Sequence, residues 1–379
     1  KDIKEIEFTL DQIEKGNFKH FMLKEIFEQP NAVKDAIRGR IDSSNHVKLG
    51  GVNDFMDRIF NAKDIFITAC GTSWHAAQIG SYLLEDILNK PIKVEYASEF
   101  RYRNKSVNQN SLVIAISQSG ETADTLAAVM KAKEKNALTL GIVNVVGSSI
   151  ARETDCGIYM HAGPEIGVAS TKAFTTQLVT LASLAIAIGR DRTHITRSEE
   201  EELASALTEV PSRVAEVLNH DVALRGLAEH IFEERDVLYI GRGTSYAIAL
   251  EGALKLKEIS YIHAEGYAAG ELKHGPIALI DDGVPVIVIA PNDNSFEKTS
   301  ANMQEVLARG GRVILMSDAD GVAQMGDRAF ASITLPKVSP LVAPILYAIP
   351  VQLLAYHIAA LKGTDIDQPR NLAKSVTVE

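Results

Sequence analysis

Two segments of this chain repeat the same order of elements, and this repeat limits the folds that the chain can adopt. Residues 64–69 and 236–240 are apolar and strand-like, and each leads into Gly-Thr-Ser, at 71–73 and 243–245. An amphipathic helix is predicted after each turn, because apolar residues recur there at helical spacing. A strand that enters a helix through such a turn is typical of parallel α/β units.

Later segments of the two halves also correspond. The matching pairs of strands and closing helices are 111–116 with 284–289, 138–143 with 312–316, and 174–188 with 346–361. The alternation predicts an α/β protein with two similar doubly wound parallel-sheet domains in tandem, with a helical boundary near 190–220. Ligands bind such sheets beyond the carboxyl ends of the strands, at the point where the strand order reverses.

Composition and charge restrict the class of protein. A length of 379 residues exceeds the size at which one hydrophobic core stops growing, which agrees with two domains. With 46% hydrophobic and 23% charged residues, the chain is typical of a globular protein rather than a membrane protein. A net charge of −10 without a Lys/Arg stripe argues against nucleic acid as a partner, because binding DNA or RNA requires clustered cations.

The cysteines and the first residues indicate a cellular location. Cys70 and Cys156 are too few for a disulfide framework or a structural zinc site, and both are predicted to fill core space. Their scarcity favours a reducing cytoplasm. The opening Lys-Asp-Ile-Lys-Glu lacks the apolar region of a signal peptide, and the absence of an initial Met suggests a fragment or a processed chain.

One strand of the first half ends in a loop of small polar side chains. Ser117, Gln118, Ser119 and Thr122 surround Gly120 where the next helix should begin. Glycine permits a tight turn, and hydroxyl groups together with the free N–H groups of a helix start bind anions. The pattern favours a phosphate site, although the same residue types also serve as ordinary helix caps.

The two halves differ in the residues that they carry, which predicts anion binding in the first half and the reactive groups in the second. The segment of the second half that corresponds to this loop is Ala-Pro-Asn-Asp at 290–293, whose carboxylate would repel a phosphate, so one phosphate site is predicted. Only the second half places Glu251, Lys255 and Glu258 on one face of its first helix. Their spacing fits an exposed helix with Glu–Lys pairs. It also fits a helix on which a partly buried carboxylate acts as a general base, so both interpretations stay open.

Two further candidates lie in segments without clear periodicity. His274 stands in a glycine-rich segment over 265–276, predicted to be a loop, and histidine suits proton transfer near neutral pH, although a lone loop histidine is more often structural or exposed. No second His or Cys stands at metal-ligand spacing, so neither a metal nor a cofactor is predicted. Lys374 lies in a polar tail that should fray, yet a desolvated lysine can form a Schiff base.

Together these segments closely resemble the isomerase half of the glutamine:fructose-6-phosphate aminotransferases, the glucosamine-6-phosphate synthase family. The resemblance covers nearly the whole chain and rests on Ala69–Ser73, Ser117–Thr122, Glu165–Thr176, Leu254–Gly275 and Asp367–Glu379. The tail is its most specific part. The implied domains are a helical lead-in from a glutaminase domain (1–45), sugar isomerase (SIS) domain 1 (46–195), SIS domain 2 (196–365) and the tail (366–379).

The resemblance implies roles for individual residues. The sugar phosphate would be held by Ser73, Ser117, Gln118, Ser119 and Thr122, and the sugar itself would be bordered by Val168, Ser170 and Ala373. Four residues would carry the chemistry: Lys374 as the Schiff-base lysine, Glu258 as the group that moves a proton between C1 and C2, Lys255 as support for the developing charge, and His274 for ring opening. His274 would act in the neighbouring subunit of a homodimer.

The implied substrate is fructose 6-phosphate, and the implied products are glucose 6-phosphate or glucosamine 6-phosphate in cytoplasmic hexosamine biosynthesis. The family's glutaminase half begins with a nucleophilic cysteine that this sequence lacks, so we expect no glutamine hydrolysis from it. Two other functions remain open. One is a two-SIS deglycase of fructosamine phosphates, against which the tail argues, and the other is a non-catalytic phosphosugar sensor.

Overall fold

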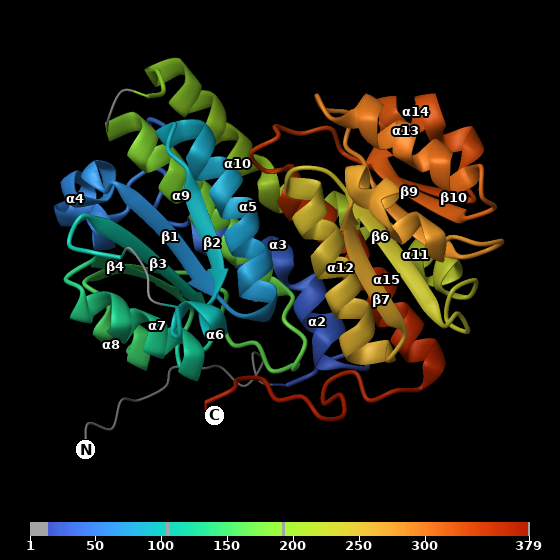
Figure 1. The fold of residues 1–379 in the computed structure, drawn as a ribbon, viewed down its shortest axis with the longest axis horizontal. Coiled ribbons are helices and arrows are strands. Elements are labelled where there is room, and N and C mark those ends of the chain that lie inside the picture. Colours follow the sequence, from blue (N-terminus) through green and yellow to red (C-terminus); the bar gives the residue numbers. More distant parts are fainter. Residues whose placement is uncertain (1–13, 104–106, 192–193, 378–379) are drawn as a thin grey trace.

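The computed structural model of the protein describes residues 14–103, 107–191 and 194–377. Parts of the predicted lead-in (1–13) and of the predicted tail (378–379) therefore lie outside the described residues. Two α/β domains stand side by side, with long helices between their sheets (Figure 1). The strands of the first sheet are β1 (Asp64–Ala69), β2 (Ile92–Tyr96), β3 (Ser111–Ser117), β4 (Leu138–Val143) and β5 (Cys156–Tyr159). Those of the second are β6 (Asp236–Gly241), β7 (His263–Ala268), β8 (Pro285–Ile289), β9 (Arg312–Asp318) and β10 (Ala331–Leu335).

Both sheets are entirely parallel and share one topology. Their orders are β2-β1-β3-β4-β5 and β10-β9-β8-β6-β7, so each domain has the order 2-1-3-4-5 when its own strands are counted. The predicted fold class of two doubly wound parallel sheets in tandem is confirmed. The strand order reverses between β1 and β3 in the first sheet and between β6 and β8 in the second, where such sheets bind ligands.

The strands that the sequence predicted are the inner ones. All six predicted strands are present, because their residues are buried on both faces and form continuous apolar runs. The four strands that it missed, β2, β5, β7 and β10, are the sheet edges and are only partly buried. The prediction of a loop over 265–276 was therefore wrong for its first part, which pairs with β6 as β7.

Helices cover both sheets and connect their strands. Those that precede or cover the first sheet are α2 (Phe21–Phe27), α3 (Gln29–Ile37), η1 (Gly50–Phe55), α4 (Met56–Asn61), α5 (Gly71–Leu88), α6 (Ala97–Phe100), α7 (Ala123–Glu134), α8 (Ser149–Glu153) and α9 (Lys172–Asp191). Those that follow are α10 (Arg197–Leu218), α11 (Asp221–Ala228), α12 (Thr244–Ser260), η2 (Ala269–His274), η3 (Pro276–Leu279), α13 (Phe296–Leu307), α14 (Ala319–Met325), η4 (Gly326–Arg328) and α15 (Ala343–Lys362).

One hydrophobic core joins the domains. Buried residues of α5, α9, α10, α12 and α15 belong to the same apolar cluster, which lies between the two sheets. Helices α9 and α15 are long and apolar enough to cross a membrane, but they are buried inside the protein along nearly their whole length and serve as its central helices. Gln29 of α3 bonds Gln352 of α15 and Thr175 of α9, which satisfies the buried amide between them.

The contact between β7 and α12 gives a test of this packing. A Cβ atom on Gly266 would lie 2.7 Å from the backbone nitrogen of Leu250, so Gly266→Ala should destabilise the fold by about 1–3 kcal/mol. Gly226 in α11 has open space around it, and Gly226→Ala should leave stability unchanged or raise it by up to about 1 kcal/mol. Urea unfolding midpoints of both variants measure the difference, and equal midpoints would contradict the close approach.

Candidate active site

A cavity of about 310 Å³ lies beyond the carboxyl ends of β1 and β3, where the strand order of the first sheet reverses. Its walls come from the turn after β1, the loop after β3, the segment 168–170, the last turns of α12 and the tail. Eleven of the twelve residues to which the resemblance assigns a role line it: Ser73, Ser117, Gln118, Ser119, Thr122, Val168, Ser170, Lys255, Glu258, Ala373 and Lys374. Their individual roles remain predictions.

The loop after β3 makes a tight turn at Gly120, where any other residue would be strained. Gly120 has φ +66°, and a Cβ atom on it would lie 2.0 Å from the Ser148 hydroxyl oxygen. The Ser117 hydroxyl accepts a hydrogen bond from the N–H of Gly120 and contacts the Thr122 hydroxyl at 3.0 Å. Thr122, at the N-cap position, makes no side-chain hydrogen bond to α7. It lines the cavity together with Ser117, Gln118 and Ser119.

The tail, described as far as residue 377, makes polar contacts with several other segments. The Ser375 hydroxyl contacts that of Ser119 at 2.9 Å, and the carbonyl of Val376 accepts the first free N–H of α7, that of Ala123. At its base, the Asp367 carboxylate accepts the backbone N–H groups of Phe21 and Met22 at the start of α2, at 2.9 and 3.0 Å. Polar contacts to other segments thus replace the apolar burial that the tail sequence lacks.

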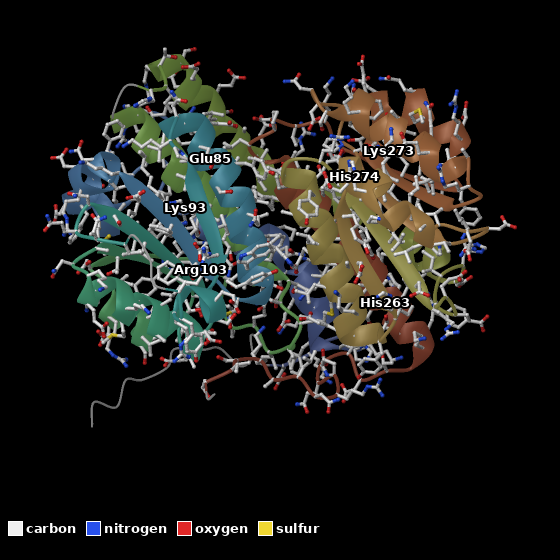
Figure 2. All side chains as sticks on the ribbon, in the orientation of Figure 1. Glu85, Lys93, Arg103, His263, Lys273 and His274 are labelled. Carbon is white, nitrogen blue, oxygen red and sulfur yellow. The ribbon has the colours of Figure 1, made fainter. Side chains whose placement is uncertain are left out.

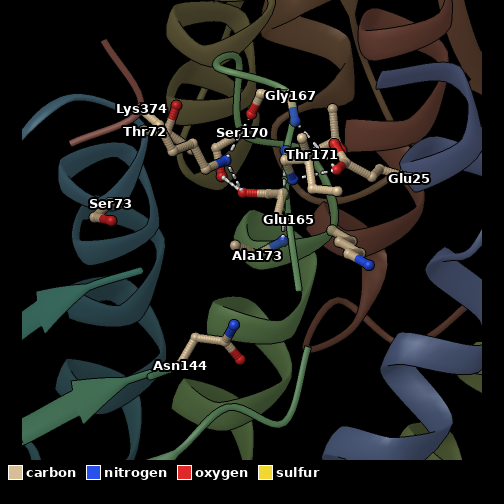
Figure 3. Close-up of polar contacts among 12 residues, drawn as sticks. Glu25, Thr72, Ser73, Asn144, Glu165, Gly167, Ser170, Thr171, Ala173 and Lys374 are labelled. Carbon is tan, nitrogen blue, oxygen red and sulfur yellow. Dashed lines mark hydrogen bonds and ion pairs between the residues drawn. The ribbon is translucent and has the colours of Figure 1, made fainter. Parts of the chain in front are cut away.

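Lys374 reaches from the tail to a buried carboxylate (Figure 3). Its Nζ donates to Glu165 Oε2 at 2.5 Å and to the carbonyl of Gly167 at 2.8 Å. The other oxygen of Glu165, Oε1, accepts the backbone N–H groups of Thr171 and Ala173 at 2.9 and 3.0 Å. Burial acts to raise the pKa of Glu165, but the charge and hydrogen bond of Lys374 and these N–H groups outweigh it and lower that pKa, so the carboxylate stays ionised.

A second buried carboxyl lies behind the first. Glu25 of α2 accepts the N–H groups of Ile166 and Gly167 with Oε1, while its Oε2 has no hydrogen-bond partner. Burial and the neighbouring charge of Glu165 raise the pKa of Glu25 to about 8. At neutral pH the Glu25 carboxyl is therefore protonated, and the pair carries a single negative charge.

The charged face of α12 is buried, so the alternative of an exposed helix is wrong. Glu251 is fully buried and Lys255 nearly so, with Nζ 2.6 Å from Glu258 Oε2 and 3.5 Å from Glu251 Oε1. Burial acts to lower the pKa of Lys255, but Glu258 and Glu251 outweigh it and raise that pKa. Lys255 is therefore a fixed cation beside Glu258 rather than a base.

Two side chains of the first domain complete this cluster. The hydroxyl of Thr72 donates to Glu251 Oε1 at 3.1 Å and accepts from Lys255 Nζ at 3.1 Å. His75 Nδ1 lies 2.7 Å from Glu251 Oε2. Because Thr72 and His75 stand in the first turns of α5, directly after β1, these bonds hold the charged face of α12 against the first domain. That domain carries the loop of residues 117–122 after β3, called the serine loop from here on.

His274 is the predicted site residue that does not line this cavity. Glu258 lies in the last turn of α12, a helix about 25 Å long, and β7 then runs back along that helix. His274, at the end of η2 after β7, is exposed on the second domain and lies far from the tail (Figure 2). Cys70 also departs from its prediction as a core residue, because it is only partly buried and borders the cavity.

Sequence reasoning missed the partners of the charged groups. It assigned no role to Glu165, Glu25, Thr72 or His75, since each contacts a group that is more than 100 residues away in the chain. The repeated Gly-Thr-Ser was the one available signal for Thr72. Within the described ranges, no group of three or more His, Cys, Asp or Glu side chains is placed to hold a metal ion.

Comparisons with known proteins agree with this architecture. Residues 58–187 and 230–362 match the SIS domain family. The glutamine–fructose-6-phosphate aminotransferase (isomerizing) of Chlorobaculum tepidum is 55% identical over 385 residues, which cover 100% of this chain and 62% of that protein. The protein of the same name from Bacteroides thetaiotaomicron is 52% identical, with the same coverage. The chain thus spans less than two thirds of the length of these curated relatives.

Solved structures show the same fold. The C-terminal domain of glucosamine-fructose-6-phosphate aminotransferase from Francisella tularensis superposes with a TM-score of 0.89 at 43% identity, covering 94% of this chain and 100% of that one. Glucosamine-6-phosphate deaminase from Thermotoga maritima has a TM-score of 0.73 at 22% identity, covering 94% and 99% of the two chains. The second likeness concerns the fold alone.

The protonation of Glu25 can be tested through the pH dependence of the protein's stability. Because its pKa is raised from the usual 4.5 to about 8, folding takes up a proton between these values, and stability should fall by up to about 1.4 kcal/mol per pH unit across that window. Glu25→Gln mimics the protonated form and should remove this loss. Thermal unfolding midpoints measured from pH 5 to about 9 should therefore fall more steeply in the unmodified protein than in the variant as the pH rises.

The exposed Glu229 at the end of α11 provides the control for this series. Glu229→Gln removes the same charge without touching the buried pair. A constant offset between Glu25→Gln and the unmodified protein at every pH would contradict a protonated Glu25.

Proposed function

We propose a function on the premise that this chain belongs to the SIS domain family, as the counterpart of the C-terminal domain of the glutamine–fructose-6-phosphate aminotransferases. The proposed function is binding of fructose 6-phosphate and its conversion from ketose to aldose, toward glucosamine 6-phosphate when an amino group is supplied. The observation that carries it is one cavity that contains the serine loop, Lys374 and Glu258 together.

The serine loop provides the proposed phosphate site. Its hydroxyl groups, the turn at Gly120 and the nearby start of α7 offer uncharged donors and a favourable helix dipole. Ser73, at the start of α5, adds a further hydroxyl, which accepts from the Gln177 amide at 2.9 Å. In the second domain, Asp293 and Asp318 border the corresponding cavity, which supports one phosphate site rather than two.

The remaining residues suit the chemistry of isomerisation. Lys374 would form a Schiff base with the ketose carbonyl, which acidifies the hydrogen at C1. Ammonia would then add to C2 and displace the Lys374 amine, and Glu258 would carry the C1 proton to C2 of the resulting imine. Without ammonia, Glu258 would move the same proton in the open-chain ketose, which gives the aldose. Lys255, held as a cation, would stabilise the negative charge that develops on the substrate. These two side chains are already paired at 2.6 Å on the cavity wall.

The assembly around this site is also part of the proposal. We propose a cytoplasmic homodimer in which His274 of the partner subunit opens the sugar ring, since His274 is exposed and far from the cavity of its own chain. We further propose that a glutaminase domain accompanies this region in the full-length protein and supplies ammonia, as the names and lengths of the curated relatives suggest.

The alternatives of a deglycase and of a phosphosugar sensor receive less support. A sensor needs the serine loop but has no use for a lysine carried into the cavity by the tail. The tail lysine and the buried Lys255–Glu258 pair together favour isomerisation through a covalent intermediate.

The reaction is tested by incubation with fructose 6-phosphate and borohydride. We expect a mass gain on Lys374 that is lost in Lys374→Ala, and slow formation of glucose 6-phosphate that is lost in Glu258→Gln. Lys362→Ala, at the exposed end of α15, is the matched lysine control. Substrate binding that persists with no trapping and no aldose would support the sensor, and absence of binding would contradict the proposal altogether.

The single phosphate site is tested by the two copies of the Gly-Thr-Ser turn. Ser73→Ala should weaken fructose 6-phosphate binding by about tenfold, the usual cost of one hydrogen bond to a charged group. Ser245→Ala removes the corresponding hydroxyl of the second domain and should leave binding unchanged. Titration calorimetry measures both, and a stoichiometry of two sites or an equal loss in both variants would refute the division of roles.

A further inference from the structure

We propose that Glu165 is the acid–base partner of Lys374: it takes the proton that the lysine must lose before attack and returns it to the oxygen that leaves. This inference rests on the proposed function, because it concerns Schiff-base formation in the same cavity. Its starting observation is the 2.5 Å contact between Lys374 Nζ and Glu165 Oε2.

The two oxygens of Glu165 have separate tasks. Oε1 is held by the backbone N–H groups of Thr171 and Ala173 at the start of α9, which fixes the orientation of the carboxylate. Oε2 faces Lys374 and the Ser170 hydroxyl, which donates to it at 3.0 Å. Lys374 and Ser170 both line the cavity, whereas the Glu165 side chain is fully buried behind them (Figure 3). Oε2 is thus the oxygen available for proton transfer.

The surrounding charges leave Glu165 as the proton acceptor beside Lys374. Glu25, which approaches from α2, is protonated at neutral pH and adds no charge. Lys255 on α12 is a fixed cation whose charge is matched by Glu251 and Glu258. A lysine that is paired with a carboxylate stays an ammonium, and an ammonium has no lone pair for attack. The resting contact therefore needs a proton transfer before it can become reactive.

The proposed step balances without any further reactant. Glu165 takes a proton from the Lys374 ammonium, and the amine forms a bond to C2 of the open-chain ketose while the C=O π bond breaks. The acid returns its proton to that oxygen by way of the Ser170 hydroxyl, which bonds Oε2 and lines the cavity, and the carboxylate then takes a second proton from nitrogen. When Glu165 gives this proton to the C2 hydroxyl along the same path, the C–O bond breaks, water leaves and nitrogen forms the C=N bond. Lysine, ketone and carboxylate thus become an iminium ion, one water and the same carboxylate.

Glu165→Gln tests this role, because the amide keeps the shape and the Oε1 acceptor but takes up no proton. The readout is the rate of cyanoborohydride trapping of Lys374 with fructose 6-phosphate. We expect the trapping rate at neutral pH to fall by about 100-fold or more, the usual contribution of a positioned acid–base group. Affinity for the sugar phosphate should stay within about threefold, since the phosphate is held elsewhere.

The pH profile separates proton transfer from a merely structural role. Without an internal base, Lys374 must lose its proton to water or hydroxide, so the variant's trapping rate should rise by about tenfold per pH unit, while that of the unmodified protein rises less steeply. If Glu165 only held the lysine in place, the rate would fall by the same factor at every pH. The control is Glu25→Gln, which changes the adjacent buried carboxyl to an amide. Its rate of Lys374 trapping should equal that of the unmodified protein.

The outcomes distinguish this inference from the function on which it rests. Failure of the unmodified protein to trap fructose 6-phosphate at Lys374 would overturn the proposed function. Normal trapping in the unmodified protein together with an equal rate in Glu165→Gln, or a loss that does not vary with pH, would overturn the role of Glu165 alone.

Discussion

The arrangement of the site depends on a carboxylate that is buried between the domains. Glu251 has no access to solvent, so its charge is tolerated only because His75, Thr72 and Lys255 surround it. Apolar packing between α5 and α12 holds the two helices together, but it does not fix the rotation of one helix about its axis relative to the other. The hydrogen bonds from the first turns of α5 to Glu251 fix this rotation, because each bond needs a defined direction. They place the Lys255–Glu258 pair of the second domain beside the first domain's loop.

This arrangement explains how a protein of net charge −10 can offer a site for an anion. The two lysines of the cavity are each matched by a carboxylate, Lys374 by Glu165 and Lys255 by Glu258, so the cavity itself holds little net charge. In the proposed function, attraction for the sugar phosphate would come from hydroxyl groups and the dipole at the start of α7, which act over short distances. The global charge of the surface is screened over about 10 Å and matters little there.

The sequence predicted those features that depend on local pattern. The inner strands were found because burial on both faces gives unbroken apolar runs, whereas the edge strands β2, β5, β7 and β10 mix exposed and buried positions. The serine loop and the charged face of α12 were found from composition and spacing. The tail lysine was a candidate from its chemistry alone, and the resemblance gave it a specific role. Glu165 and His75 could not be found in this way, since no local pattern marks a residue whose partner lies over 100 positions away. The contacts of the tail could not be found for the same reason.

The contact of Asp367 with the start of α2 ties the two ends of the described chain together. Six residues separate Asp367 from Lys374, and the next turn of α2 carries Glu25, which bonds the segment that directly follows Glu165. One short helix near the beginning of the chain is therefore in contact with the segments that carry both the lysine and its carboxylate partner. A displacement of α2 would change the position of the Lys374 nitrogen without passing through either sheet.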